Sequence, residues 1–282
     1  MIVTRFAPSP TGYLHLGHAF AALSAAGAAK VANGRFLLRI EDLDAGRCRP
    51  EYEAAIYADL EWLGLAWEPP VLCQSTRADA YREALARLEA LGLVYPCFCT
   101  RKEITEEIAR SVEAPHGPES QLYPGTCRVL SEAVRRERRV REPYVLRLDV
   151  AKAAALAGAL SFEEQGQGPN GERGIIVADP TLFGDIVLAR KEMPAAYHLA
   201  VVVDDAFQGV SLVTRGNDLF SATHVQRLLQ ALLGLPAPAY AHHRLILDEH
   251  GRKFSKRDGS VTLRHLREQG ETPDGIMRRL GF

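Results

Sequence analysis

Hydrophobic and polar positions at the start of the chain predict a strand, a loop, a helix and a second strand. An apolar run covers residues 2–7, an alanine-rich segment covers residues 17–32, and a second apolar run covers residues 36–40. Two prolines and Gly12 separate the first run from the helical segment. This order is typical of a right-handed parallel unit, whose first loop lies at the edge where such sheets bind ligands.

The pattern further along the chain continues this alternation and predicts an α/β fold. Residues 50–65 and 78–91 have the apolar spacing of amphipathic helices. Residues 199–203 form a continuous apolar run, which is typical of a buried parallel strand. We therefore expect Asp204 and Asp205, which follow this run, to lie at the carboxyl edge of the sheet.

Composition and charge limit the classes of protein to which the chain can belong. The chain has 282 residues, of which 47% are hydrophobic and 24% charged, an ordinary globular composition. It has no apolar run long enough to span a membrane and no secretory leader, so we expect a cytoplasmic protein. Its net charge of −1 means that a nucleic-acid partner needs a local basic face. The arginine-rich residues 133–141 are either a solvated helix end or a contact for RNA phosphates.

Two short segments carry candidate chemistry for a phosphate ligand. His15 and His18 lie on one face of the first helical turn, and Gly17 between them leaves the backbone accessible. The helix N-terminus and two imidazoles suit a phosphate, although two capping or surface histidines are the simpler interpretation. Far downstream, Lys256 lies in a glycine-flanked basic loop, residues 253–257, that is either a phosphate-binding loop or merely solvated.

Three cysteines suggest a metal site. Cys97, Cys99 and Cys127 offer three soft ligands, which suit zinc in a chain without a leader. Their spacing differs from the usual pair of cysteines separated by two residues, so three free thiols are the alternative.

The two phosphate-binding candidates together resemble the signatures of a known family. His15-Leu-Gly-His18 is similar to the HIGH signature of class I aminoacyl-tRNA synthetases, and Lys253-Phe-Ser-Lys-Arg257 is similar to their KMSKS signature. The segment Arg5-Phe-Ala-Pro-Ser-Pro-Thr-Gly12 resembles the glutamyl/glutaminyl branch. The resemblance implies a Rossmann-type parallel-sheet catalytic domain, an inserted zinc-binding acceptor-type subdomain and a short C-terminal region that contacts the tRNA stem. The domains expected are residues 1–93 with 179–235, residues 94–178, and residues 236–282.

The resemblance also implies roles for individual residues. Arg5 would pair with a carboxylate of glutamate, Glu41 with its α-amino group, and Arg215 with its side-chain carboxylate. Tyr123 is implied as the fourth zinc ligand, and His116 is its competitor. One Zn²⁺ per chain and Mg²⁺ with ATP are the expected cofactors. The sets implied are His15, His18 and Lys256 for catalysis; His15, Gly17, His18, Lys253, Ser255 and Lys256 for ATP; Arg5, Phe6, Ala7, Pro8, Ser9, Glu41, Tyr197 and Arg215 for glutamate; and Cys97, Cys99, Tyr123 and Cys127 for zinc.

The expected function follows from the position of the lysine loop near the end of the chain. Full glutamyl-tRNA synthetases continue past this loop into an anticodon-reading region, whereas this sequence ends at Phe282. The pattern resembles shortened paralogues, which activate L-glutamate with ATP without tRNA and transfer it to the queuosine base at the wobble position of tRNA(Asp). We expect a monomer that contacts the anticodon stem-loop of that tRNA and no membrane.

Three alternatives to this function differ in their class. The first is a truncated glutamyl-tRNA synthetase that charges the terminal adenosine of tRNA(Glu). The second is a tRNA-binding module without catalysis, and the third is an enzyme that makes the adenylate of another acid.

Overall fold

The computed structural model describes the chain apart from residues 101, 104–122, 124, 191 and 248–260. The described residues divide into two compact units. The first unit comprises residues 1–76, 210–217 and 240–282, and the second comprises residues 77–209 and 218–239. The boundaries of the predicted domains stay a prediction.

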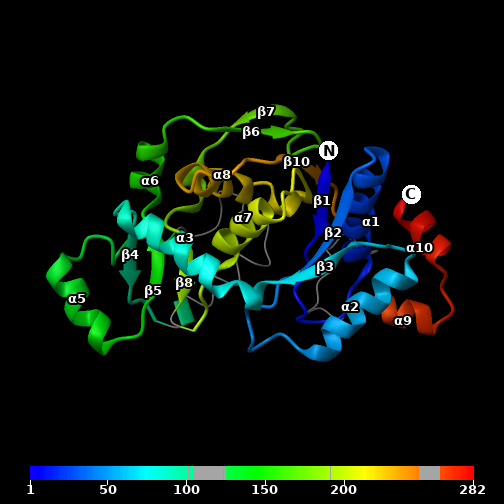
Figure 1. The fold of residues 1–282 in the computed structure, drawn as a ribbon, viewed down its shortest axis with the longest axis horizontal. Helices are drawn as coiled ribbons and strands as arrows, with labels where there is room; N and C mark the ends of the chain where they lie inside the picture. Colours follow the sequence, from blue (N-terminus) through cyan, green and yellow to red (C-terminus); the bar gives the residue numbers. More distant parts are fainter. Residues whose placement is uncertain (101, 104–122, 124, 191, 248–260) are drawn as a thin grey trace. The chain divides into compact units, whose positions relative to one another are not determined.

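A parallel sheet forms the centre of the first unit. Strands β1 (Val3–Phe6), β2 (Arg35–Ile40) and β3 (Glu68–Cys73) lie in this order and run parallel, with Thr4 opposite Phe36. Helix α1 (Leu16–Val31) packs on β1 and β2 (Figure 1). The strand, helix and second strand predicted from the sequence are therefore confirmed.

Segments from much later in the sequence complete the first unit. Strand β9 (Leu212–Gly216) runs along β1, where the backbone N–H of Ser211 donates to the carbonyl of Val3 over 3.0 Å. Strand β10 (Ala239–His243) pairs with β9. Helices α2 (Pro50–Trp62), α9 (Leu263–Glu268) and α10 (Pro273–Leu280) lie in the same unit, with the short turns η1 (Gln74–Arg77) and η3 (Asn217–Leu219) at its boundaries.

The apolar core of the first unit joins the two ends of the chain. Leu14 and Leu38 are fully buried, and they belong to the same cluster as Leu263 and Ile276. The backbone N–H of Leu263 also donates to the carbonyl of Leu14 over 2.8 Å. Helices α9 and α10 are therefore part of the packing that holds the loop after β1.

The second unit combines an antiparallel sheet, a hairpin and helices. Strand β5 (Val145–Leu148) lies between β4 (Val94–Cys97) and β8 (Val187–Arg190), and both pairings are antiparallel. Strands β6 (Ser161–Glu164) and β7 (Gly174–Val177) form the hairpin. The remaining elements are α3 (Ala78–Ala90), α5 (Glu132–Arg141), α6 (Val150–Ala157), η2 (Pro180–Phe183), α7 (Tyr197–Phe207) and α8 (Ala222–Leu232).

The strand predicted at residues 199–203 is wrong, because these residues lie inside helix α7. Helices α3 and α8 pack on α7 within the second unit (Figure 1), and seven of the eleven residues of α7 are buried, including Leu199, Ala200, Val201 and Val202 of the apolar run. A helix that is apolar all round has no amphipathic period, and a short apolar run cannot then be told from a buried strand. Asp204 is consequently not at a sheet edge: it is buried in α7 and accepts hydrogen bonds from Tyr81 and Arg77.

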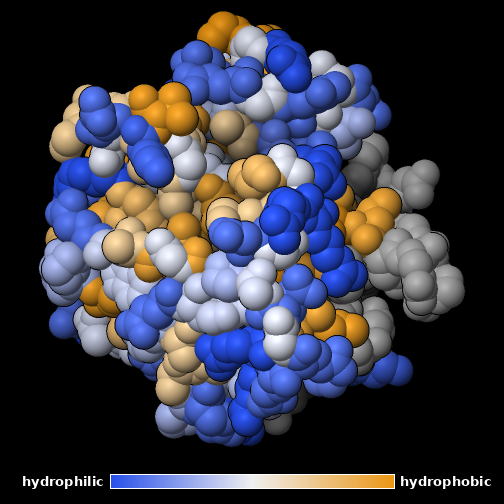
Figure 2. Space-filling view, turned by 90° about the vertical axis from the view of Figure 1, so that its right-hand side faces the viewer, coloured by the Kyte–Doolittle hydropathy of each residue, from blue (hydrophilic) through white to orange (hydrophobic). Residues whose placement is uncertain are grey.

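No helix in the described part of the chain is both long and apolar enough to cross a membrane. On the face shown in Figure 2, hydrophobic residues are interspersed with hydrophilic ones.

Candidate active site and candidate metal centre

His15 and His18 cap helix α1 with their own side chains. Nδ1 of His15 accepts from the backbone N–H of Gly17 over 3.1 Å, and Nδ1 of His18 accepts from the backbone N–H of His15 over 3.2 Å. The two rings lie 3.8 Å apart between centroids. Because both Nδ1 atoms accept, each neutral ring carries its proton on Nε2. The capping interpretation is thus correct, and the same tautomer makes each Nε2–H a donor for an anionic ligand.

Gly17 leaves room for the His15 ring. A Cβ atom at position 17 would lie 3.0 Å from Cε1 and 3.2 Å from Nδ1 of His15. A larger residue would therefore require the ring to move by a few tenths of an ångström.

Charged residues proposed for an amino acid gather at the carboxyl ends of three strands of the first unit. Arg5 on β1 is buried, and its Nη1 donates to the carbonyl of Thr214 on β9 over 3.3 Å. Arg215, the next residue of β9, is also buried. Glu41 follows β2 directly, its backbone N–H donates to the carbonyl of Pro8, and its carboxylate pairs with Arg39 over 3.2 Å. These contacts bring Arg5, Arg215 and Glu41 to one edge of the first unit.

The other residues of the predicted amino-acid and ATP sets have different settings. Phe6 and Pro8 are buried and Ala7 and Ser9 are half-buried in the loop that leaves β1, where Phe6 belongs to the apolar core. Tyr197 is the first residue of α7 and lies in the second unit. Lys253, Ser255 and Lys256 lie outside the described residues.

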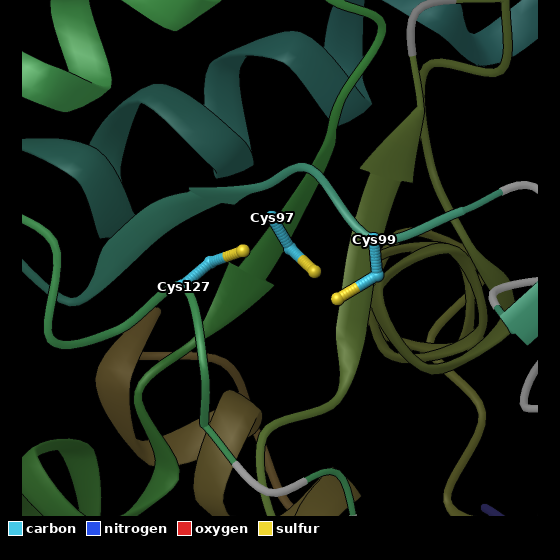
Figure 3. A group of neighbouring side chains, drawn as sticks. All are labelled: Cys97, Cys99 and Cys127. Carbon is cyan, nitrogen blue, oxygen red and sulfur yellow. The ribbon is translucent and has the colours of Figure 1, made fainter.

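The structure brings the three predicted cysteine ligands together in the second unit. Cys97 ends β4, Cys99 follows it, and Cys127 comes from a separate loop; their sulfur atoms all lie within 4.8 Å of one another. Figure 3 shows the three sulfur atoms turned toward a common centre. Two thiolates bonded to one zinc ion at about 2.3 Å are separated by roughly 4 Å, so this cluster fits the ion.

Tyr123 lies beside the sulfur atoms, as the resemblance implied. Its hydroxyl oxygen is 3.2 Å from Sγ of Cys97 and 3.5 Å from Sγ of Cys99. The backbone N–H of Cys127 donates to this oxygen over 3.0 Å, and the backbone N–H of Phe98 donates to Sγ of Cys127 over 3.2 Å. The oxygen therefore lies next to the sulfur atoms, and Tyr123 as the fourth ligand stays a prediction, while His116 lies outside the described part of the chain.

The electrostatic setting of the cluster differs from one ligand to the next. Burial disfavours the thiolate of Cys97, but hydrogen bonds from Tyr123, the Cys99 backbone and Arg147 outweigh it and lower its pKa. Burial raises the pKa of Cys99 to about 12, and burial together with hydrogen bonds to the sulfur atoms raises the pKa of Tyr123. In the metal-free cluster Cys97 therefore loses its proton more readily than Cys99 or Tyr123. A bound divalent cation would favour the ionised form of its ligands.

Sequence reasoning missed residues that support these two sites. Arg147 is 1% exposed on β5, and its Nη1 donates to the carbonyl of Asp185 over 2.7 Å. The carboxylate of Asp185 accepts from Tyr95 and Arg128 nearby. A charged residue within the apolar run of β5 was a visible signal for Arg147, whereas nothing in the sequence marks His242, which contacts Arg215.

The arginines of α5 have partners within the protein. Arg138 pairs with Glu142 over 2.6 Å and Arg141 with Glu137 over 2.8 Å. Arg139 lies 3.6 Å from Glu89. Exposed ion pairs of this kind are weak, so both interpretations of residues 133–141 stay open.

The chain is similar to known proteins along its whole length. The family profile described as "tRNA synthetases class I (E and Q), catalytic domain" matches residues 1–282. A Rhodobacter capsulatus protein named glutamyl-Q tRNA(Asp) synthetase is 49% identical over 285 residues, which cover 100% of both chains. A Nocardia farcinica protein of the same name is 46% identical, and the match covers 98% of this chain and 82% of that protein.

A solved structure shows the same fold in a longer protein. The crystal structure of a glutamate tRNA ligase from Elizabethkingia meningosepticum, in complex with its amino acid, has a TM-score of 0.71 and 31% identity. The match covers 92% of this chain and 52% of that ligase, so the chain spans about half the ligase's length.

Proposed function

Because the chain belongs to the class I tRNA synthetases of the E and Q type, we propose that it activates L-glutamate with ATP and transfers it to queuosine in tRNA(Asp). The main observation in favour of glutamate as the substrate is that two buried cations, Arg5 and Arg215, lie on neighbouring strands. Two carboxylates of one substrate suit two buried guanidinium groups. The names of the relatives at 49% and 46% identity support queuosine as the acceptor.

Binding of glutamate in this proposal uses the edge formed by β1, β2 and β9. Arg5 would pair with one carboxylate and Arg215 with the side-chain carboxylate, each through parallel N–H bonds of a planar fork. Glu41 would accept from the α-amino group, and the role that the resemblance implies for Tyr197 stays a prediction. Glutamine would leave a buried cation without a counter-charge, and such a loss costs more than the loss of a neutral contact.

Adenylate formation is a displacement at phosphorus. An oxygen of the α-carboxylate attacks the α-phosphorus of ATP, the bond to the bridging oxygen of the β-phosphate breaks, and pyrophosphate leaves. His15 and His18 would donate from Nε2 to the phosphate oxygens at the N-terminus of α1, and Lys256 would contact the departing phosphates. Class I synthetases use ATP with Mg²⁺, which offsets phosphate charge. In the transfer step a hydroxyl of the queuosine cyclopentenediol ring attacks the carbonyl carbon of the adenylate, and AMP leaves.

The cluster of Cys97, Cys99, Cys127 and Tyr123 is proposed to hold one zinc ion. Zinc would supply a cross-link between β4 and the loop that carries Cys127, which is structural chemistry rather than part of the reaction. The fit of the three sulfur atoms and the tyrosine oxygen supports this assignment.

The experiment that tests the function measures two activities of the purified protein. Glutamate-dependent exchange between ATP and pyrophosphate should proceed with no RNA, because the groups proposed for glutamate and ATP all belong to the chain itself. Labelled glutamate should then reach tRNA(Asp) that carries queuosine, but not the same tRNA with guanosine at that position, which lacks the accepting hydroxyl.

The alternative is a glutamyl-tRNA synthetase that charges the terminal adenosine of tRNA(Glu), which the similarity to glutamate tRNA ligases favours. Robust charging of unmodified tRNA(Glu) would replace our proposal with this one. Absence of exchange with glutamate would reject both.

A further inference from the structure

A hydrogen bond in the first unit holds the guanidinium of Arg215. Its Nε–H donates to Nε2 of His242 over 3.0 Å. Arg215 is 5% exposed and His242 is 3% exposed, so water does not compete for this bond. Their strands, β9 and β10, are neighbours in one sheet.

Because Arg215 is the donor of this hydrogen bond, the tautomer of the His242 ring is determined. A guanidinium group has only donors, so Nε2 of His242 must offer a lone pair, and the ring proton must sit on Nδ1. The His242 ring lies parallel to that of Tyr240, with an angle of 6° and 6.0 Å between centroids. The guanidinium carbon of Arg215 lies 5.2 Å from the centroid of the same tyrosine ring. Tyr240 and His242 therefore both pack against the Arg215 guanidinium.

The direction of this bond determines how Arg215 can meet a ligand. With Nε directed at His242, a carboxylate that forms two parallel bonds would meet the edge made by the two terminal nitrogens. An arginine side chain has many rotamers, and ordering it costs free energy on binding unless the protein has already ordered it.

We propose that His242 is a positioning residue that orients Arg215 for the side-chain carboxylate of glutamate and thereby contributes to selection of glutamate over glutamine. This inference rests on the proposed role of Arg215 in the amino-acid pocket. His242 should therefore affect the binding of the amino acid and not the binding of ATP.

The test compares two substitutions of similar size at one position. The amide oxygen of His242→Gln can accept from Arg215, whereas His242→Met fills the space without an accepting oxygen or nitrogen. His243→Gln is the matched control, because His243 is the next residue on β10 and contacts the Phe20 ring and the Arg244 carbonyl instead. The measurement is exchange between ATP and pyrophosphate, with KM for glutamate, KM for ATP, kcat and the activity with glutamine.

His242→Met should raise KM for glutamate about tenfold, the scale of one lost hydrogen bond to a charged group, and should reduce the preference over glutamine. KM for ATP and kcat should stay within twofold, roughly the noise of a difference measurement. His242→Gln and His243→Gln should resemble the wild type. An unchanged KM for glutamate in His242→Met would overturn the proposal, and so would equal losses in His242→Met and His242→Gln.

A second measurement does not depend on the folding of a variant. Ring-nitrogen NMR of the wild-type protein should show His242 neutral with its proton on Nδ1, and an imidazolium or the other tautomer would contradict the inference. Failure of the proposed function has a different signature. In that case the wild-type protein itself would show no exchange with glutamate.

Discussion

The guanidinium carbon of Arg147 lies 3.9 Å from the centroid of the Tyr123 ring. A cation at this distance from an aromatic face is attracted by the ring, and the attraction grows when the pair is desolvated. Arg147 also hydrogen-bonds Cys97. One buried arginine therefore contacts two of the four proposed metal ligands, and it offsets part of the negative charge that three thiolates would bring to the site.

Tyr123→Phe should weaken zinc retention at least about tenfold, the scale of a disturbed ligand shell, because the oxygen that faces Cys97 and Cys99 is removed. Competition with a chelator, followed by elemental analysis, measures the effect. Tyr144→Phe is the matched control, since Tyr144 packs on Phe98 in the same apolar cluster. A larger loss with His116→Ala than with Tyr123→Phe would give the fourth position to His116, and a wild-type protein without zinc would remove the metal site.

Substitutions of His15 should separate its two roles. His15→Ala removes the cap of α1 and should lower the free energy of unfolding by about 1 kcal/mol, whereas His15→Asn restores an accepting side chain at the cap. Both should reduce exchange between ATP and pyrophosphate by about 10²-fold, because neither has the imidazole Nε2–H. Urea denaturation and the exchange assay provide the two readouts. Full activity in His15→Asn would restrict His15 to a capping role.

Lys256→Ala should reduce adenylate formation by at least about 10²-fold, the scale lost with one preorganised charge-stabilising donor. Glutamate binding should survive, because Arg5, Glu41 and Arg215 all belong to other segments of the chain. Isothermal calorimetry with glutamate and the exchange assay test the two statements. Loss of glutamate binding would mean that the lysine loop shapes the amino-acid pocket.

Asp59 should make the protein less stable as pH rises. Burial raises its pKa from 3.8 to about 6, and Arg267, 3.8 Å away, only partly opposes this. Neither carboxylate oxygen has a hydrogen-bond partner among the residues that the structure describes. The native state keeps a proton that the unfolded chain releases above pH 3.8, so the free energy of unfolding falls until the pH passes about 6. The full loss is on the order of 3 kcal/mol.

Asp59→Asn removes this titration. Compared with the wild type, its urea midpoint should gain most above pH 6 and least near pH 3.8. Asp79→Asn is the control, because Asp79 is an exposed helical aspartate with 93% of its side chain accessible. A gain of equal size near pH 3.8 and above pH 6 would exclude ionisation of Asp59 as the cause.

Local patterns predicted the elements that turn residues separate from one another. Strands β1 and β2 are short apolar runs and helix α1 is an alanine-rich segment, with two prolines and Gly12 before the helix and Gly34 after it; the structure has all three within a residue or two of the predicted positions. The run at residues 199–203 is equally short and apolar, so the sequence cannot distinguish a buried strand from a buried helix there, and packing against α3 and α8 decides.

The site residues also differ in how far the sequence could predict them. The three cysteine ligands could be singled out among the five cysteines of the chain by residue type and by their place in one segment, residues 97–127. The roles of His242 and Arg147 depend on a distance of a few ångströms across strands, which no local pattern encodes. The capping bonds of His15 and His18 likewise required coordinates, since the same residues could have pointed at a ligand alone.

The contact between Leu14 and Leu263 has a consequence for how the protein is made. The histidine-bearing turn leaves the ribosome early, but the residues that bury its apolar side, in α9 and α10, are synthesised hundreds of positions later. The apolar side of the turn therefore stays partly solvated for most of translation, because contacts between distant residues form only after both have been synthesised. Ribosome-bound nascent chains that stop before Val261 should consequently be far more sensitive to proteolysis near α1 than chains released in full.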